Sequence, residues 1–302
     1  MSGKLTLATR RSMLALAQSR AFAAELVGRN PGLVVDELLM VTAGDRTQDR
    51  PLMDIGGKGL FVKELEEALL DGRAHFAVHS IKDVPAELLP GLHIAAIPAR
   101  ADPRDVLVSR EGRKLAELPA GARVGTSSLR RAVAIREARP DLVTEAVRGN
   151  VDTRIRKLHE GQFDAIVLAR AGLLRLGREG EASEVLEPEV SLPAVGQGAL
   201  GIESRVDDVG TMEALAAVVD DEATICVRAE RAVMLAVNGN CRVPIAAYAL
   251  HVGDEMWLRG MLADEDGGRP RRGERRIAWP GPGQVAEGER AGRDLGAELL
   301  RA

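Results

Sequence analysis

Short apolar runs alternate with amphipathic stretches along the first two-thirds of the chain, and this alternation constrains the fold more than any other feature. Residues 5–8 and 34–41 have the length and apolar character of strands, and residues 12–27 between them carry apolar side chains at helical spacing. Strands that alternate with helices indicate βαβ units. We therefore expect an α/β fold with a mainly parallel sheet.

The same alternation starts again after Asp102-Pro103-Arg104-Asp105. Strands are expected at residues 106–108, 143–147 and 165–169, and a helix is expected at residues 151–159. This second α/β unit runs to about residue 192. The segment 193–198 then breaks the pattern, and residues 199–203 form one more strand.

The last third of the chain has a different pattern, typical of a small α+β unit. Residues 223–237 are helical, and residues 245–250 and 255–262 alternate like a hairpin around Gly253-Asp254. A closing helix is expected near residues 284–299. The charge-dense run 269–276 is interpreted as a solvated strand edge or turn.

Composition excludes several classes of function. Aromatic residues make up only 2% of the 302 residues, which argues against stacking platforms for single-stranded nucleic acid. A net charge of −4 argues against broad binding to DNA or to anionic membranes. The sequence shows neither a signal peptide nor a run of about 18 apolar residues. We therefore expect a cytoplasmic protein without nucleic-acid or membrane partners.

The two cysteines differ in their surroundings. Cys226 falls within the apolar pattern of a helix and is expected to be buried and inert. Cys241 lies in a turn, beside Arg242, which favours the reactive thiolate and makes a covalent role plausible. No Cys or His cluster has the spacing of metal ligands, so no metal is expected. The five histidines are scattered and are expected to be structural.

Residues 125–131, GTSSLRR, are the most informative segment for function. A strand ends there, hydroxyl residues turn the chain, and a helix begins, so free backbone N–H groups and a partial positive charge accumulate. Two arginines follow at once, which favours an anion site. The donors of this site would be Thr126, Ser127, Ser128, Arg130 and Arg131. The alternative is a plain helix cap by Ser127 or Ser128 with solvated arginines.

Two further turns repeat the combination of arginine with small polar residues after a strand. One is residues 148–154, RGNVDTR, and the other is Thr9-Arg10-Arg11-Ser12. Ligands of open α/β sheets bind at the carboxyl ends of strands. The three turns together predict a ligand with several negative charges, unless all three are merely polar and solvated.

Lys82 and Asp83 also follow a predicted strand, at residues 75–79. An Asp beside a Lys at a strand end can hold or relay a proton, although a weak surface ion pair is the alternative. The segment Gly56-Gly57-Lys58-Gly59 lacks the spacing of a phosphate-binding loop and favours a mobile lid instead.

Taken together, these segments resemble the hydroxymethylbilane synthase family, also called porphobilinogen deaminases. The resemblance runs in order through residues 5–250, whereas the last fifty residues match only in general character. The stretches that carry it are LATRRSMLALAQ, VTAGDR, GGKGLFVKELEEALL, AVHSIKDVP, DPRDVLVS, VGTSSLRR, RPDL, RGNVDTR, DAIVLARAGLLRLG, SLPAVGQGALGIE, AERAVM and NCRVPIAAYA.

The resemblance implies a three-domain fold of two α/β lobes, each like a lobe of a type II periplasmic binding protein, plus a small C-terminal α+β domain. Domain 1 would comprise residues 1–98 and 199–217. Domain 2 would comprise residues 99–198, and domain 3 residues 218–302. The family is usually monomeric.

The resemblance also implies the activity. The family condenses four porphobilinogen molecules into hydroxymethylbilane with release of ammonia, on a dipyrromethane cofactor bound through a thioether. Cys241 matches the position of that linkage, and Asp83 matches the catalytic carboxylate. The cofactor would be held by Lys82, Ser12, Thr126, Ser128, Arg130 and Arg131. The substrate would be bound by Arg10, Ser127, Arg148, Arg154, Arg175 and Gln197.

The sequence departs from the family pattern at Asn240, where Gly is usual, at Asp152 and at Arg170. Asn tolerates a left-handed backbone, so the shape of the loop can survive.

A competing hypothesis is a non-enzymatic anion-binding module, which would explain the lobes and the arginines but would not need Cys241 or Asp83. A cysteine hydrolase would need a nearby His, and no matching segment supplies one.

Overall fold

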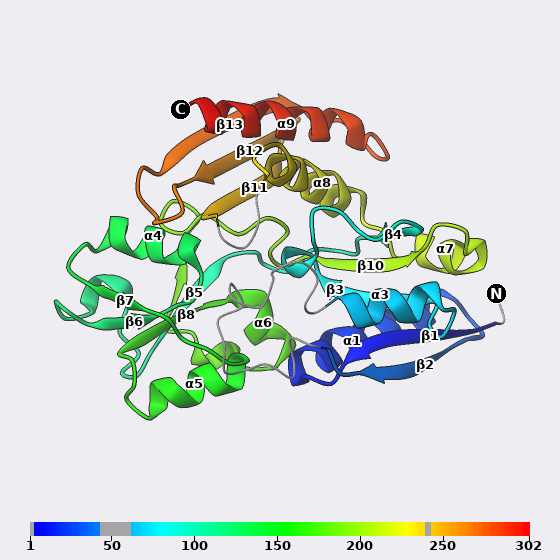
Figure 1. The fold of residues 1–302 in the computed structure, drawn as a ribbon, viewed down its shortest axis with the longest axis horizontal. Helices are drawn as coiled ribbons and strands as arrows, with labels where there is room; N and C mark the ends of the chain where they lie inside the picture. The colour runs from blue at the N-terminus through cyan, green and yellow to red at the C-terminus, as the bar shows by residue number, and fades with distance from the viewer. Residues whose placement is uncertain (1–2, 43–61, 239–242) are drawn as a thin grey trace. The chain divides into compact units, whose positions relative to one another are not determined.

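The computed structural model describes residues 3–42, 62–238 and 243–302 (Figure 1). The chain forms two compact units. The first unit comprises Met1–Arg100 and Ala199–Thr224, and the second comprises Ala101–Gly198 and Ile225–Ala302. Within the described ranges, no helix has both the length and the apolar character needed to cross a bilayer.

The first unit is built on a mixed sheet of five strands in the order β2-β1-β3-β10-β4. Its strands are β1 (Gly3–Arg10), β2 (Leu33–Met40), β3 (Phe76–Ser80), β4 (Leu92–Ala96) and β10 (Leu200–Arg205). Strand β1 pairs parallel with β2 and β3, whereas β10 pairs antiparallel with β3 and β4. The expected mainly parallel sheet is therefore only half right. The reason is that β10 enters through a late return of the chain and not through a βαβ crossover.

Helices cover both faces of this sheet (Figure 1). Helix α1 (Met13–Arg29) begins after Ser12, whose Oγ accepts a hydrogen bond from the Ala15 N–H at 3.3 Å. Phe22 and Leu26 of α1 share one apolar cluster with α7 (Val209–Ala216). Helix α3 (Lys63–Leu70) packs in a separate cluster on the other face.

The second unit contains a sheet with the same arrangement, in the order β7-β6-β8-β5-β9. Its strands are β5 (Asp105–Ser109), β6 (Arg123–Gly125), β7 (Val143–Glu145), β8 (Ala165–Ala169) and β9 (Glu184–Leu186). Strand β6 pairs parallel with β7 and β8, and β5 pairs antiparallel with β8 and β9. The two sheets thus repeat one topology, which confirms the predicted pair of α/β lobes.

Helices α4 (Leu129–Ala138), α5 (Val151–His159) and α6 (Arg170–Arg175) flank this second sheet. Ile135 of α4 packs in one cluster, and the apolar residues of α5 and α6 pack in another. The helix predicted at 151–159 and the strand predicted at 165–169 have the bounds that the periodicity gave. Short 3-10 helices lie at Ile81–Asp83, Leu115–Glu117 and Glu179–Glu181.

The C-terminal part is a three-stranded antiparallel sheet in the order β11-β12-β13, covered by two helices. Its elements are α8 (Asp221–Ala236), β11 (Ile245–Val252), β12 (Glu255–Leu262), β13 (Arg271–Ala278) and α9 (Val285–Arg301). The two-residue turn Gly253-Asp254 confirms the predicted hairpin, since Val252 pairs with Glu255. Helices α8 and α9 approach closely at Gly292, where a Cβ would lie 2.2 Å from the carbonyl oxygen of Ala229. The small α+β unit is therefore confirmed.

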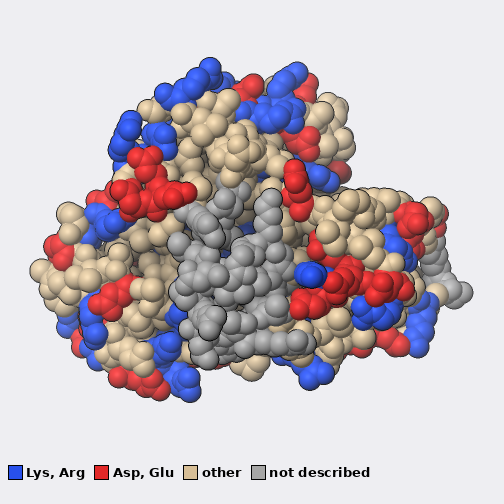
Figure 2. All heavy atoms as spheres, in the orientation of Figure 1, with Lys and Arg blue, Asp and Glu red and all other residues tan. Residues whose placement is uncertain are grey.

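The charge-dense run forms strand β13, at an edge of the C-terminal sheet. Figure 2 shows Lys and Arg side chains gathered over this sheet and α9 at the top of the view, with Asp and Glu among them. Each arginine of the strand has an acidic partner, in the pairs Arg271–Asp264, Arg272–Glu137, Arg275–Glu298 and Arg276–Glu255. This strand is a charged sheet edge, as interpreted from the sequence, and charge of this kind discourages edge-to-edge association.

Candidate active site

A small pocket opens at the carboxyl ends of β1 and β3 in the first unit. Its polar lining comes from Arg10, Ser12, Gln18, His79, Ser80 and Asp83, and its volume is about 70 Å³. A water molecule occupies roughly 30 Å³ of liquid, so the pocket has room for a single small polar group such as a carboxylate. The structure therefore brings together three of the predicted site residues of this unit, namely Arg10, Ser12 and Asp83.

Asp83 ends the 3-10 helix Ile81–Asp83 that follows β3. Ile81 is buried and anchors this turn, whereas Lys82 and Asp83 are exposed. A buried apolar residue thus fixes the backbone beneath two charged side chains. The arrangement holds the Asp83 carboxylate at the rim of the pocket without burying it.

In the second unit, the segment 125–131 forms the expected strand-to-helix turn. Ser128 caps α4, because its Oγ accepts a hydrogen bond from the Arg131 N–H at 3.4 Å. The Oγ1 of Thr126 accepts from the Ser128 N–H at 3.2 Å, and the Ser127 hydroxyl donates to the Val147 carbonyl at 2.7 Å. Because the Thr126 and Ser128 oxygens accept in these bonds, their hydroxyl protons can still be donated to an anion.

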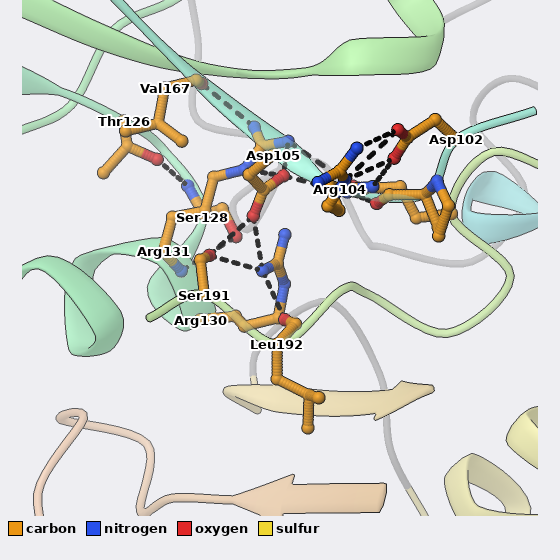
Figure 3. Close-up of polar contacts among 12 residues, drawn as sticks. Asp102, Arg104, Asp105, Thr126, Ser128, Arg130, Arg131, Val167, Ser191 and Leu192 are labelled. Atoms are coloured by element: carbon orange, nitrogen blue, oxygen red, sulfur yellow. Dashed lines mark hydrogen bonds and ion pairs between the residues drawn. The ribbon is translucent and has the colours of Figure 1, made fainter. Parts of the chain in front are cut away.

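Arg130 and Arg131 converge on one buried carboxylate, that of Asp105 at the start of β5 (Figure 3). Arg130 Nη1 lies 2.7 Å from Asp105 Oδ2, and Arg131 donates from Nε and Nη2 to Oδ1 at 3.0 and 2.7 Å. The Ser191 hydroxyl donates to Oδ2 at 2.7 Å. The side chain of Asp105 is 0% exposed, and those of Arg130 and Arg131 are 5% and 8% exposed. The alternative of solvated arginines is therefore wrong.

Two guanidinium groups against one carboxylate leave this cluster with a net positive charge. Burial alone would raise the pKa of Asp105, but the charges and hydrogen bonds of Arg130 and Arg131 hold it well below the ordinary carboxyl range. Burial also lowers the pKa of Arg130, and the neighbouring Arg131 lowers it further, although Asp105 acts in the opposite direction. A net positive cluster that is largely desolvated attracts an anion more strongly than a solvated one would.

The turn Gly196–Gly198 completes this cluster. Gln197 donates from Nε2 to Asp105 Oδ1 at 2.9 Å and to the Pro103 carbonyl at 2.6 Å, and its Oε1 accepts from Arg131 Nη2 at 3.4 Å. Arg175 Nη2 donates to the Gly198 carbonyl at 2.7 Å. Gln197 is 1% exposed. The amide therefore orients Arg131 from within the protein.

Gly198 is required by both backbone geometry and space. Its φ is +88°, and a Cβ would lie 2.4 Å from the Ala101 carbonyl oxygen. We expect Gly198→Ala to lower the free energy of unfolding by about 2–4 kcal/mol, from left-handed strain and overpacking together. Gly177→Ala is the matched control, because Gly177 has φ +64° and no atom within 4 Å of the added Cβ. Urea titrations that gave equal losses for both variants would contradict the packing argument.

The turn before α5 holds the remaining predicted arginines. Asn150 caps this helix by accepting from the Thr153 N–H at 2.9 Å, and Arg154 Nε donates to the Gly149 carbonyl at 2.8 Å. Arg148 and Arg154 are half-buried. Asp152, a departure from the family pattern, pairs with Arg178 at 2.7 Å. Asp152 therefore has a local cationic partner, which it shares with Glu181, also 2.7 Å from Arg178.

The second departure, Arg170, is also neutralised. Its Nη1 lies 2.6 Å from Asp102, which Arg104 binds from the other side at 2.7 Å. Burial would raise the pKa of Asp102, but the hydrogen bonds and charge of Arg104, aided by the charge of Arg170, lower it. The extra cation therefore serves a local ion-pair network.

Three sequence interpretations lie outside the described residues. They are the cofactor cysteine Cys241, the departure Asn240 and the glycine-rich segment 56–59. Cys226, in contrast, is described, and it is buried in the core of the C-terminal part as predicted. In the described part of the chain, no cluster of His, Cys, Asp or Glu has the composition of a metal site.

The histidines have structural contacts, as expected. His75 Nδ1 accepts from the Thr6 N–H at 2.9 Å, and His79 Nε2 lies 2.8 Å from the buried Glu203. His93 contacts Ser204, His159 pairs with Glu181, and His251 stacks on Trp279.

Sequence reasoning missed the residues that hold the arginines in place. The sequence pattern places Asp105 in the segment that separates the two α/β units and indicates no role for Ser191. A signal was present, because Asp105 directly precedes the apolar run Val106–Leu107–Val108 and so begins a buried strand. A carboxylate at such a position requires a cationic partner.

Comparisons with known proteins identify the family. The family model described as porphobilinogen deaminase, dipyromethane cofactor binding domain, matches residues 5–213. The model described as porphobilinogen deaminase, C-terminal domain, matches residues 224–301. A protein of Sorangium cellulosum (strain So ce56) named porphobilinogen deaminase is 68% identical over 301 residues, covering 100% of both chains.

Solved structures of low identity resemble the fold alone. The VFT2 domain of Bordetella pertussis BvgS is 15% identical with a TM-score of 0.44, over 71% of this chain and 86% of that one. The probable amino-acid transporter binding protein ytmK of Bacillus subtilis is 9% identical with a TM-score of 0.43, over 74% and 94%.

The family models together match most of the chain, and the relative matches it from end to end. The protein belongs to the porphobilinogen deaminase family.

Proposed function

We propose that this protein joins four porphobilinogen molecules head to tail into the linear tetrapyrrole hydroxymethylbilane, with release of ammonia. The observation that carries this proposal is the 68% identity, over the whole chain, to a protein named porphobilinogen deaminase. The matches to both family domains, one after the other along the sequence, support the same activity. The protein is accordingly a transferase of porphyrin biosynthesis.

A dipyrromethane cofactor, attached to Cys241 through a thioether, would supply the pyrrole ring to which the first substrate is joined. The donors within each unit suit carboxylates, because each unit combines arginines with hydroxyl donors at strand ends. The residues that would hold it are Lys82, Ser12, Thr126, Ser128, Arg130 and Arg131. Of these, Arg131 is held in a fixed orientation by Asp105 and Gln197.

Substrate binding requires further cations, because each porphobilinogen brings an acetate and a propionate. We assign this role to Arg10, Ser127, Arg148, Arg154 and Arg175, and we assign Gln197 to the positioning of Arg131. Carboxylates that leave water need partners of opposite charge, since an unpaired buried charge is prohibitive. The net positive charge of the Asp105 cluster supports this assignment.

Asp83 would act on the reacting atoms. At each condensation the carbon–nitrogen bond of the substrate breaks, ammonia leaves with the bonding electrons, and positive charge develops on the pyrrole nitrogen. A new carbon–carbon bond then forms, and the attacked ring carbon loses a proton. An anionic carboxylate held at the rim of the pocket stabilises that positive charge in each step.

We further propose that the chain divides into three domains. The first comprises residues 1–98 and 199–217, the second residues 99–198, and the third residues 218–302. We also propose that the protein acts as a cytoplasmic monomer without nucleic-acid or membrane partners. The monomer is inferred from the family resemblance, and the net charge of −4 supports the absence of polyanionic partners. Sedimentation above the mass of one chain would contradict the monomer.

The activity is tested first by the intact mass of the purified protein. We expect an added mass equal to two deaminated porphobilinogen units, because the cofactor is covalent. Cys241→Ser is expected to lose that mass and all turnover. Cys226→Ser is the matched control and is expected to keep both, since Cys226 is buried in the core. A wild-type protein with the bare chain mass, folded and supplied with cofactor, would contradict the proposed function.

A further inference from the structure

The three residues of the turn Gly196–Gly198 each bind a different element of the second unit. The Gly196 N–H donates to Glu230 of α8 at 2.7 Å. The Gln197 amide joins Asp105 of β5 to Arg131 of α4, and the Gly198 carbonyl accepts from Arg175 of α6. One short turn thus connects a C-terminal helix with two of the arginines assigned to ligand binding.

Glu230 is the anchor of this connection. It is 0% exposed, and its second oxygen, Oε1, accepts from the Ala249 N–H of β11 at 2.9 Å. A buried carboxylate needs hydrogen-bond donors for both oxygens, and here each oxygen accepts from a backbone amide. The turn is therefore tied to α8 and to β11 at the same time.

The turn needs such an anchor because its backbone is inherently permissive. Gly196 has a φ of +66° and Gly198 a φ of +88°. Glycine populates left-handed and right-handed conformations about equally, so the sequence alone does not hold this shape. The Glu230 carboxylate holds one end of the turn whose other two residues bind Arg131 and Arg175.

We infer that Glu230 is a positioning residue for substrate binding, acting through this turn on Arg131 and Arg175. The inference rests on the proposed function, in which these two arginines bind carboxylates of the cofactor and the substrate. Guanidinium recognition of a carboxylate depends on the orientation of the planar fork, so a displaced turn weakens binding even though both arginines remain. If Glu230 were purely structural, its replacement would change the stability of the protein and leave substrate binding unchanged.

Glu230→Gln is the variant that tests the inference. A glutamine carbonyl can satisfy only one of the two backbone N–H groups, so the turn or β11 loses its partner. We expect the KM for porphobilinogen to rise about tenfold, the loss of roughly one charge-assisted hydrogen bond, with a smaller change in kcat. We also expect faster hydrogen–deuterium exchange of the segment 194–198 in the holoenzyme.

The control is Asp220→Ala, which removes a carboxylate at the start of the same helix. Asp220 accepts from the Ala223 N–H at 2.7 Å, and no described hydrogen bond joins Asp220 to the turn. We expect this variant to lower the thermal midpoint and to leave KM and exchange of the segment 194–198 unchanged. A Glu230→Gln variant that behaved in the same way would overturn the inference.

Gln197→Ala provides a second test, because it cuts the link to Arg131 and leaves Glu230 in place. It is expected to raise KM as well. In the double variant with Glu230→Gln, the combined rise in KM, as a free energy, should be smaller than the sum of the two single effects. Full additivity would show that Glu230 does not act through the turn. A wild-type protein that consumes no porphobilinogen would instead refute the proposed function, while hydrogen exchange would still report on the turn.

Discussion

Asp83→Asn is expected to fold, to keep the mass of the bound cofactor and to lose at least about a hundredfold in kcat, because a neutral amide cannot stabilise the positive charge that develops on pyrrole nitrogens. The side chain lies at the rim of the first-unit pocket, and it is exposed. The substitution therefore costs little stability. The measurement is the rate of hydroxymethylbilane formation, with intact mass and circular dichroism on the same preparation.

The matched control is Asp71→Asn. Asp71 is also an exposed carboxylate of the first unit, but it pairs with Arg73 and lies outside the pocket. Its turnover is expected to equal that of the wild type. If Asp83→Asn kept normal turnover, Asp83 would have no part in the mechanism, and if it lost the cofactor, its role would be in binding.

Asp105→Ala is expected to lower the free energy of unfolding by about 3–5 kcal/mol, because it leaves two buried guanidinium groups without their carboxylate. The comparison variant is Asp102→Ala, which removes a partly exposed partner of Arg104 and Arg170 and should cost about 1 kcal/mol or less. Denaturant titration at neutral pH measures both. Equal losses would contradict the assignment of Asp105 as the buried counter-ion.

The same residue predicts a dependence on pH. The folded-state pKa of Asp105 is lowered, so its stabilisation is present above the ordinary value of 3.8 and is lost as the pH falls below it toward the folded-state value. The stability difference between the wild type and Asp105→Asn should therefore be largest at neutral pH and should narrow below pH 3.8. A difference that did not change with pH would show that the carboxylate is not ionised in the folded protein.

The sequence predicts elements well where periodicity and a cap coincide. The helix at 151–159 has Asn150 as its cap and an apolar stripe through Ile155 and Leu158, and its predicted bounds agree with the structure. The helix α6, directly after β8, was not predicted, because it has only six residues and no side-chain cap. Strand pairing is also absent from periodicity, so the place of β10 came only from the family resemblance.

The candidate site was predicted in part for a similar reason. The hydroxyls and arginines at strand ends are local signals, and the structure places Arg10, Ser12 and Asp83 on one pocket. The burial of Arg130 and Arg131 depends on residues that are distant in the sequence. Asp105 lies 25 residues and Ser191 61 residues from Arg130, and Gln197 lies 66 residues from Arg131. No local pattern reports a contact between such distant segments.

The place of β10 in the first sheet has a consequence for synthesis of the protein. This strand lies between β3 and β4, yet it follows them by more than a hundred residues. While the chain emerges from the ribosome, the N-terminal segment therefore exposes two unpaired strand edges until residues 200–205 arrive. Unpaired edges promote association with other chains, and late, non-local pairing slows folding. We therefore expect nascent chains of this protein to benefit from protection by chaperones until β10 is in place.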